Sequence, residues 1–158
     1  MTVVIGVDVG GTKTAMGPVD AAGRLVAEPI QVPTVTMNTE AFITGMTASL
    51  HRAIETHQAH EPAVIGLACA GTIDAARRTV VSSPNLPLKR VPLADILSAS
   101  MGMPVILEND VNAALLAEST VGVARGVDHV VMLALGTGVG GALLLDGRLY
   151  RGSGGGAG

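Results

Sequence analysis

The sequence predicts an α/β fold built on a mixed sheet, and two observations carry this prediction. Short apolar runs bounded by glycine turns alternate with segments whose apolar residues recur at helical spacing. In addition, an apolar run, a glycine turn and a second apolar run occur together twice, over residues 3–14 and 130–143, and a Gly-Arg-Leu step follows each copy. Glycine turns let the backbone approach a ligand and leave N–H groups free for phosphate. We therefore interpret the repeat as a duplicated β-hairpin that holds one ligand between two halves.

The first elements are predicted as an antiparallel meander. Residues 3–9 and 13–19 are apolar runs joined by Gly10-Gly11, and a turn over residues 20–23 leads into a third strand over residues 25–32. Short turns of this kind connect neighbouring antiparallel strands.

A helix and another strand are predicted next. From Thr39 to about residue 58 the apolar residues fall at helical spacing, with Asn38 or Thr39 as the N-cap. Pro62 ends that segment, and residues 64–70 are predicted as a buried strand that stops before Gly71.

The middle of the chain is predicted to alternate between strands and helices. Two prolines make residues 84–87 irregular, because they fit neither a helix nor a central strand. The regular elements expected here are strands over residues 79–81 and 105–107, and helices over residues 93–101 and 111–121. We expect Pro92 to begin the first of these helices and Gly102 to end it.

The last part of the chain is predicted to be incomplete. The second hairpin, from about residue 128, has no helix of its own to cover it, and the chain ends on a glycine loop over residues 151–158. A lone hairpin is marginally stable. We therefore expect one domain over residues 1–125 and the start of a second over residues 126–158, with the chain a fragment of a longer protein. The alternative is a complete small domain with a flexible tail.

The composition argues against several classes of function. Hydrophobic residues make up 48% of the chain and charged residues 15%, which is typical of a folded globular protein. The chain has one Tyr, one Phe and no Trp, a net charge of −3 and no run of basic residues longer than a pair. These features argue against nucleic acid as a partner. We find neither a signal peptide nor a membrane span, and we expect a cytoplasmic protein.

The single cysteine, Cys69, allows no intrachain disulfide and no cysteine-based zinc site within this chain. It lies in an apolar run and is predicted to be a small buried residue. The four histidines show no metal-binding spacing and are predicted to lie on the surface.

Two glycine motifs match nucleotide-binding patterns only in part. Gly136, Gly138 and Gly141 have the spacing of the dinucleotide fingerprint, but a strand follows them where that motif requires a helix. Residues 10–14 are similar to a P-loop, but Thr12 separates the glycine from the lysine and a strand follows here too. Both departures favour phosphate-binding hairpins over loop-to-helix sites.

Asp8 lies near the end of the first predicted strand, in an otherwise apolar run. Burying a carboxylate there costs several kcal/mol unless it is paired or bound to a cation. We interpret it as a Mg²⁺ ligand acting through water, beside phosphates. A turn-capping aspartate is the alternative. Lys13 either offsets phosphate charge or is simply solvated.

Residues 108–112, Glu-Asn-Asp-Val-Asn, follow a predicted strand and open a helix. Asn109 or Asp110 could act only as an N-cap. However, three polar residues exceed what one cap needs, and ligands of open α/β sheets bind at this edge. A carboxylate here could accept the proton of a substrate hydroxyl.

Together these segments resemble the ROK family of sugar kinases and repressors, within the wider superfamily of actin, hexokinase and heat-shock chaperones. Residues 8–13 and 135–141 resemble the two phosphate motifs of the family, and residues 108–114 resemble the segment with its catalytic aspartate. Gly71 and residues 85–87 match positions that border the sugar. The resemblance implies an RNase H-like, actin-like ATPase fold with a five-stranded mixed sheet. Residues 1–125 would then bind sugar and phosphate, and residues 126–158 would start an ATPase domain with its first hairpin.

The resemblance also implies an activity, the phosphorylation of a hexose at its primary hydroxyl by ATP and Mg²⁺, as in a glucokinase. Asp110 would be the catalytic base, Gly71, Asn85 and Asn109 would bind the sugar, and Asp8 would hold Mg²⁺ through water. The residues implied at the nucleotide are Gly6, Asp8, Gly10, Gly11, Thr12, Lys13, Gly136, Thr137, Gly138 and Gly140. A homodimer is also expected.

The sequence departs from the family pattern in three places. It stops before a Glu-x-Gly-His segment that grips the sugar and before a Cys/His zinc cluster, so we expect zinc only outside this chain and no activity from the isolated chain. A proline that often precedes the family's glycine is missing at residues 68–71. The alternatives left open are a sugar-sensing regulator without its DNA-binding domain, an interaction module, an N-acetylhexosamine substrate and polyphosphate as the donor.

Overall fold

The computed structural model describes residues 3–57, 62–136 and 138–157, and its centre is a mixed five-stranded sheet. Its strands, in spatial order, are β3 (Ile30–Pro33), β2 (Lys13–Val19), β1 (Val3–Val9), β4 (Pro62–Cys69) and β8 (Val105–Asn109). β1 runs antiparallel to β2 and parallel to β4, and β4 runs parallel to β8. The predicted α/β class with a mixed five-stranded sheet is confirmed.

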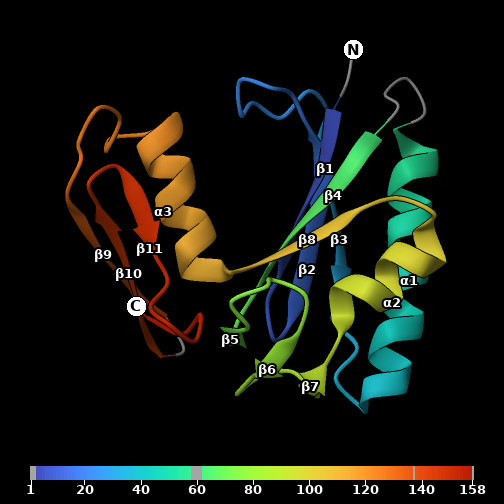
Figure 1. Cartoon of the computed structure of the whole chain (residues 1–158). Coiled ribbons are helices and arrows are strands. Elements are labelled where there is room, and N and C mark those ends of the chain that lie inside the picture. The colour runs from blue at the N-terminus through green and yellow to red at the C-terminus, as the bar shows by residue number, and fades with distance from the viewer. Residues whose placement is uncertain (1–2, 58–61, 137, 158) are drawn as a thin grey trace.

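Two helices cover one face of this sheet, α1 (Thr39–Thr56) and α2 (Leu93–Met101) (Figure 1). Alternate residues of β1 point toward them and are buried, whereas Asp8 is exposed on the opposite face. α1 begins where the side chain of Asn38 accepts a hydrogen bond from the N–H of Ala41, at 2.8 Å. Pro92 is the N-cap of α2 and Gly102 its C-cap, so the helix begins and ends as predicted.

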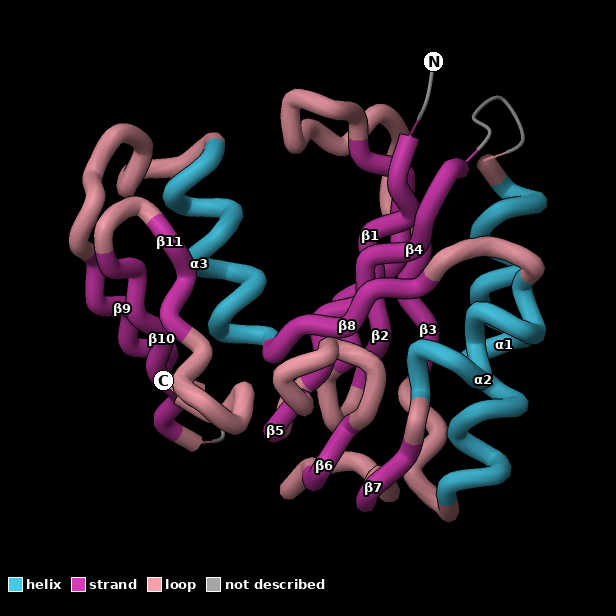
Figure 2. The backbone as a smooth tube through the Cα atoms, viewed as in Figure 1, coloured by secondary structure: helices cyan, strands magenta, loops and turns pink. Residues whose placement is uncertain are grey.

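The third helix, α3 (Asp110–Thr120), joins the first sheet to a second sheet. That sheet consists of β9 (Val130–Leu135), β10 (Val139–Leu145) and β11 (Arg148–Tyr150), all antiparallel. Figure 2 shows α3 between the two sheets, on the side of the first sheet away from α1 and α2.

The expectation that the second hairpin has no covering helix is wrong. Val111 and Leu115 of α3 pack against Ala142 and Leu144 of β10. In the sequence α3 follows the last strand of the first sheet. However, Val111 and Leu115 are four positions apart and therefore lie on one face of the helix, the face toward the second sheet. The other face of the second sheet stays open to solvent within the described chain. Four of its residues are between 69% and 80% exposed: Val131, Leu133, Leu135 and Val139.

Two further differences concern short strands. A small antiparallel sheet contains β5 (Thr72–Ile73), β6 (Val80–Ser82) and β7 (Lys89–Val91), of which only β6 was predicted. The third strand is shorter than the predicted 25–32, since Leu25 makes a single bridge to Val19 and β3 begins only after Pro29. Pro29 has no N–H to donate to the ladder.

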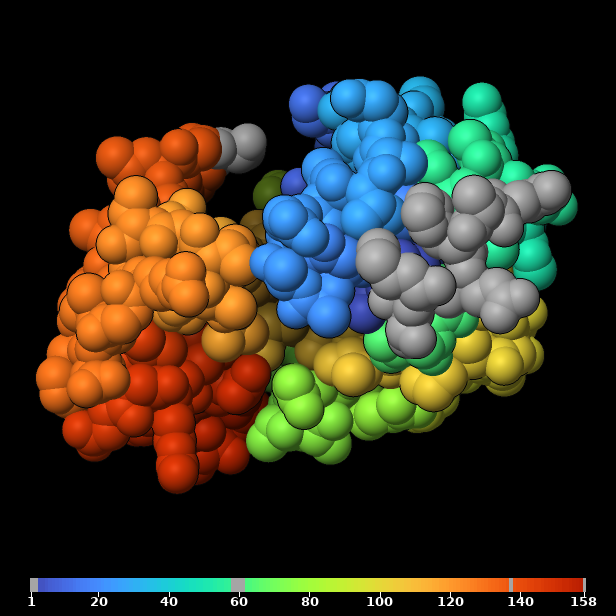
Figure 3. Space-filling model, turned by 90° about the horizontal axis from the view of Figure 1, so that it is seen from above, coloured from blue at the N-terminus to red at the C-terminus, as the bar shows by residue number. Residues whose placement is uncertain are grey.

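The face of the first sheet away from α1 and α2 is lined by small residues, among them Gly6, Gly66 and Ala68. A groove of about 520 Å³ lies between this face and Ala113 and Leu116 of α3. Seen from above, it corresponds to the hollow between the orange α3 region and the blue N-terminal part of the chain (Figure 3). None of the described helices is both long and apolar enough to cross a membrane.

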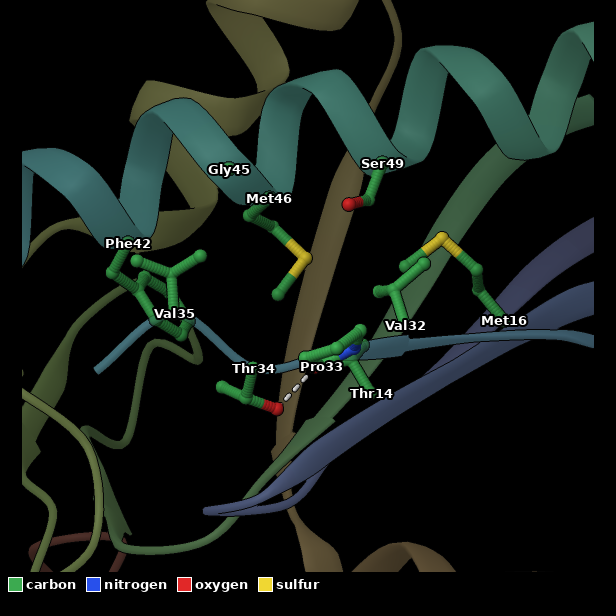
Figure 4. A pocket seen from close by; sticks show the side chains of 10 residues that line it. All are labelled: Thr14, Met16, Val32, Pro33, Thr34, Val35, Phe42, Gly45, Met46 and Ser49. Atoms are coloured by element: carbon green, nitrogen blue, oxygen red, sulfur yellow. Dashed lines mark hydrogen bonds between the residues drawn. The ribbon is translucent and has the colours of Figure 1, made fainter. Parts of the chain in front are cut away.

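A much smaller cavity, of about 20 Å³, lies between α1 and the β2–β3 edge (Figure 4). The hydroxyls of Thr14 and Thr34 hydrogen bond to each other at its base, at 2.9 Å, and Phe42 and Met46 close it from α1. It has room for about one water molecule, so we regard it as a gap in the packing and not a ligand site.

Candidate functional site

The main cavity, of about 440 Å³, lies where the two sheets approach each other. Both glycine turns line it, with Gly10 and Gly11 after β1 and Gly136 and Gly138 between β9 and β10. The two turns are far apart in sequence and belong to different sheets, so one cavity brings the duplicated hairpins together.

Each of the two turns is closed by a backbone hydrogen bond of its own. The N–H of Gly10 donates to the carbonyl oxygen of Lys13 at 3.0 Å, and the N–H of Gly136 donates to that of Gly138 at 2.9 Å. In each hairpin, therefore, the first glycine closes its own turn. The N–H groups offered to a ligand must come from the residues that follow.

Most of the residues expected at the site line this cavity. Those that do are Gly10, Gly11, Gly71, Asn85, Asn109, Asp110, Gly136, Gly138 and Gly140. Gly6 and Asp8 line the neighbouring groove on the open face of the first sheet. Thr12 precedes β2 and Lys13 is its first residue, and neither lines the cavity. Thr137 lies outside the described residues.

Asn109 and Asp110 stand at the junction of β8 and α3. The side-chain oxygen of Asn109 accepts hydrogen bonds from the N–H groups of Val111 (2.9 Å) and Asn112 (3.0 Å), which makes Asn109 the N-cap of α3. Its Nδ2 donates to Asp110 Oδ1 and to the carbonyl oxygen of Gly71, both at 3.0 Å. All four hydrogen bonds that an Asn side chain can make are therefore used.

This arrangement frees Asp110 from capping the helix. Asn109 performs that role, and it also holds one oxygen of the Asp110 carboxylate in a fixed position. Asp110 itself lines the cavity, so its carboxylate is available to a ligand.

Gly71 anchors the same cluster from the end of β4. Its φ is +135°, and a Cβ at this position would lie 2.3 Å from the carbonyl oxygen of Ser82. Only glycine fits this backbone without strain. The carbonyl of Gly71 thereby reaches the Asn109 side chain.

The charges at this edge of the sheet interact. Partial desolvation of Asp8 in the groove, and then repulsion from Asp110, raise the pKa of Asp8 above its ordinary value, while Lys13 acts in the opposite direction. Burial and the same Asp110 charge raise the pKa of Cys69 to about 12. Cys69 is fully buried, so it is a neutral packing residue, as predicted.

Asp8 and Asp110 are close enough for their charges to interact, so a cation near Asp8 would be favoured by both. Their mutual repulsion is the kind that a divalent cation relieves. Within the described ranges no cluster of three His, Cys, Asp or Glu side chains could hold a metal ion alone. Mg²⁺ is commonly held by one or two carboxylates together with water and substrate phosphates, and that mode suits Asp8.

Asn85 lies beside the first turn, on the irregular segment between β6 and β7. A Cβ on Gly11 would lie 3.0 Å from the Cβ of Asn85. Asn85 therefore lines the cavity next to the first glycine turn.

Several residues of the site were not found from the sequence. The cavity is also lined by Thr72, Asn112, Gly155, Gly156 and Ala157. Arg151 binds Glu108 through Nε (2.9 Å) and Nη2 (2.6 Å), a pair whose members are 43 positions apart. Nothing in the local pattern pointed to these contacts.

The sequence profile described as the ROK family matches residues 4–158. A glucokinase of Streptomyces coelicolor is 37% identical over 152 residues, which cover 96% of this chain and 46% of that protein. A crystal structure of a ROK family glucokinase from Streptomyces griseus, in complex with glucose and AMPPNP, has a TM-score of 0.89 at 37% identity. That match covers 97% of this chain and 47% of the other.

A ROK family transcriptional regulator, a homologue of the E. coli MLC protein, also has a TM-score of 0.89. That match covers 98% of this chain and 39% of the regulator at 20% identity, so it shows a shared fold alone. The chain spans about half the length of the glucokinases that it matches.

Proposed function

The chain belongs to the ROK family, and we propose that the protein containing it transfers the γ-phosphate of ATP to the primary hydroxyl of a hexose. The observation that carries this proposal is the shared cavity, because both glycine turns and the Asp110 carboxylate line it. Phosphoryl transfer depends mainly on positioning and charge neutralisation, and this cavity offers groups for both.

We assign Asp110 the role of general base. Its carboxylate would accept the proton of the sugar hydroxyl as the oxygen attacks the γ-phosphorus. Asn109 holds the Asp110 Oδ1 at 3.0 Å and is itself held by the Gly71 carbonyl. The base therefore starts from a fixed orientation, which is what catalysis by positioning requires.

The phosphates would lie between the two glycine turns. Because the N–H groups of Gly10 and Gly136 close the turns, we propose the N–H groups of Gly11, Thr12 and Gly138 as the donors. The remaining residues assigned to the nucleotide side are Gly6, Lys13, Thr137 and Gly140. When Mg²⁺ is bound, Asp8 would hold it through water, and the ion would neutralise phosphate charge.

The sugar would lie near Gly71, Asn85 and Asn109. Asn85 is free to contact a hydroxyl at the cavity edge. Asn109 can do so only by exchanging one of its present partners, because all its hydrogen-bonding positions are taken. We propose glucose as the substrate, with an N-acetylhexosamine as the alternative.

We also propose that the two parts of the chain belong to different domains with different roles. Residues 1–125 would carry the sugar and phosphate contacts of the first domain, and residues 126–158 would begin the ATPase domain. The rest of that domain, including any structural zinc, would lie beyond this chain, and the complete protein would form a homodimer.

The proposal is tested with the complete protein in a coupled assay of ADP release. Glucose, N-acetylglucosamine and N-acetylmannosamine are offered in turn, with ATP or polyphosphate as the donor. We expect sugar-dependent ADP release and a sugar phosphorylated at its primary hydroxyl. Sugar binding without turnover on any donor would overturn the kinase and favour a sugar-sensing regulator.

A further inference from the structure

We propose that Glu108 and Arg151 form a latch that positions one wall of the cavity, on its sugar side. The wall is the loop over residues 152–157, called here the wall loop. The proposal rests on the proposed function for the identity of the ligand. Its physical basis is an ion pair between the strand that precedes the base and the segment that follows β11.

The geometry and burial of the Glu108–Arg151 ion pair make it a fixed contact. Both Nε and Nη2 of Arg151 donate to Oε2 of Glu108, at 2.9 and 2.6 Å. The Glu108 side chain is only 12% exposed and that of Arg151 29% exposed. Charge-assisted pairs in which one guanidinium donates twice are strong and directional, so this contact fixes an orientation as well as a distance.

The second oxygen of Glu108 ties the latch to the base. Oε1 accepts a hydrogen bond from the N–H of Asn109 at 3.0 Å and from Nδ2 of Asn112 at 3.2 Å. Asn109 in turn holds Asp110. One carboxylate therefore connects the start of α3, the residue that orients the base, and the arginine that precedes the wall loop.

The wall loop makes its own close contact with the first part of the chain. Gly155 has φ +84°, and a Cβ there would lie 2.4 Å from the carbonyl oxygen of Ile73. The loop closes on itself through the N–H of Ala157, which donates to the Arg151 carbonyl at 3.1 Å. In Figure 1 the red segment after β11 reaches toward β5, in agreement with this contact.

The position of the wall loop indicates which ligand it serves. Gly155, Gly156 and Ala157 line the main cavity, and a Cβ on Gly156 would lie 3.3 Å from the side chain of Thr72. Thr72 follows Gly71, on the side assigned to the sugar. Breaking the Glu108–Arg151 ion pair should therefore weaken sugar binding more than nucleotide binding. It should also affect sugar binding more than the position of Asp110.

The test compares two substitutions of Arg151 with a control three residues earlier, on β11. Arg151→Met removes the charge and both hydrogen bonds, whereas Arg151→Lys keeps the charge without the double contact. Arg148→Met is the control, because Arg148 is exposed on β11 and forms no ion pair with any residue in the described ranges. Each variant is made in the complete protein.

Two measurements are made on each variant. In Arg151→Met we expect the KM for the sugar to rise about tenfold or more, with the KM for ATP changed by less than about twofold. Amide hydrogen exchange at residues 152–157 should accelerate by about tenfold in the same variant. Arg151→Lys should recover part of both effects, and Arg148→Met should show neither.

The outcomes separate the latch from the proposed function. If the unmodified protein phosphorylates no sugar, the kinase proposal fails, and hydrogen exchange alone then decides the latch. Unchanged exchange at residues 152–157 in Arg151→Met would overturn the latch, as would equal increases in both KM values. Should Arg151→Met fail to fold, Glu108→Gln removes the ion pair while keeping an oxygen for Asn109 and Asn112, and the same readouts apply.

Discussion

Replacement of Asp110 by asparagine tests the chemistry proposed for the site. The change removes the charge that would accept a proton but keeps the shape of the side chain and an Oδ1 to accept from Asn109. Helix capping is unaffected, since Asn109 performs it. Repulsion between Asp110 and Asp8 disappears. The structure therefore predicts a folded variant whose melting temperature is equal to or slightly above that of the unmodified protein.

The expected loss of activity is large by comparison. Removal of a general base lowers the rate by about 10²–10⁴-fold. At about 1.36 kcal/mol for each factor of ten, this corresponds to roughly 2.7–5.4 kcal/mol in the transition state. The pKa of Asp8 should fall in the variant, because one of the two causes that raise it is gone, whereas its burial remains.

The assay is ADP release by the complete protein at saturating sugar, with thermal unfolding and an NMR titration of Asp8 alongside. Asp146→Asn is the matched control, because Asp146 is 91% exposed in the turn between β10 and β11 and has φ +51°, which asparagine accepts. Control turnover should be unchanged. Near-normal kcat in a well-folded Asp110→Asn protein would refute the reasoning and leave Asp110 without a catalytic role.

Four further predictions follow from individual positions. A Cβ added at Gly138 would meet no atom within 4 Å. In Gly138→Ala the melting temperature should therefore change by less than about 2 °C, while the KM for ATP rises about tenfold. An unchanged KM would remove Gly138 from the phosphate site. Gly71→Ala should cost about 2–4 kcal/mol through strain and the clash with Ser82, lowering the melting temperature by about 4–16 °C in calorimetry, and a stable variant would contradict it. The raised pKa of Asp8 means that its charged form opposes folding, so Asp8→Asn should raise stability at pH 7, with the gain lost as the pH falls below the ordinary aspartate value; a gain independent of pH would argue against this. Finally, the isolated chain should self-associate through the open face of the second sheet, and Leu133→Lys should reduce the particle size in light scattering, whereas a monodisperse unmodified monomer would disprove the association.

Elements with strong local signals were predicted well from the sequence. The bounds of β1 and β2 follow from apolar runs on either side of a glycine turn, and those of α2 from Pro92 and Gly102. β5 and β7 have two and three residues, too few to show alternation, and their pairing with β6 depends on the tertiary fold. The predicted strand at 25–32 was too long because Pro29 interrupts the ladder.

The same distinction applies to the site. Both glycine turns and Asp110 could be found from the sequence, because each lies at a strand end with a local motif. The Glu108–Arg151 pair could not, because Glu108 lies on β8 and Arg151 follows β11, 43 positions later in the chain. The periodicity of α3 likewise predicted a helix but did not specify which of the two sheets its apolar face would cover.

The junction between β8 and α3 explains how the duplicated hairpins come to share one cavity. β8 ends at Asn109 and α3 begins at Asp110, so no loop separates the first sheet from the helix that packs on the second. Asp110 is thus fixed by Asn109 and Gly71 on one side and by the packing of α3 against β10 on the other. Any rotation of one sheet relative to the other must therefore move at least one of the two glycine turns relative to Asp110. We therefore expect closure of the cavity around a ligand and alignment of the Asp110 carboxylate to occur in one motion.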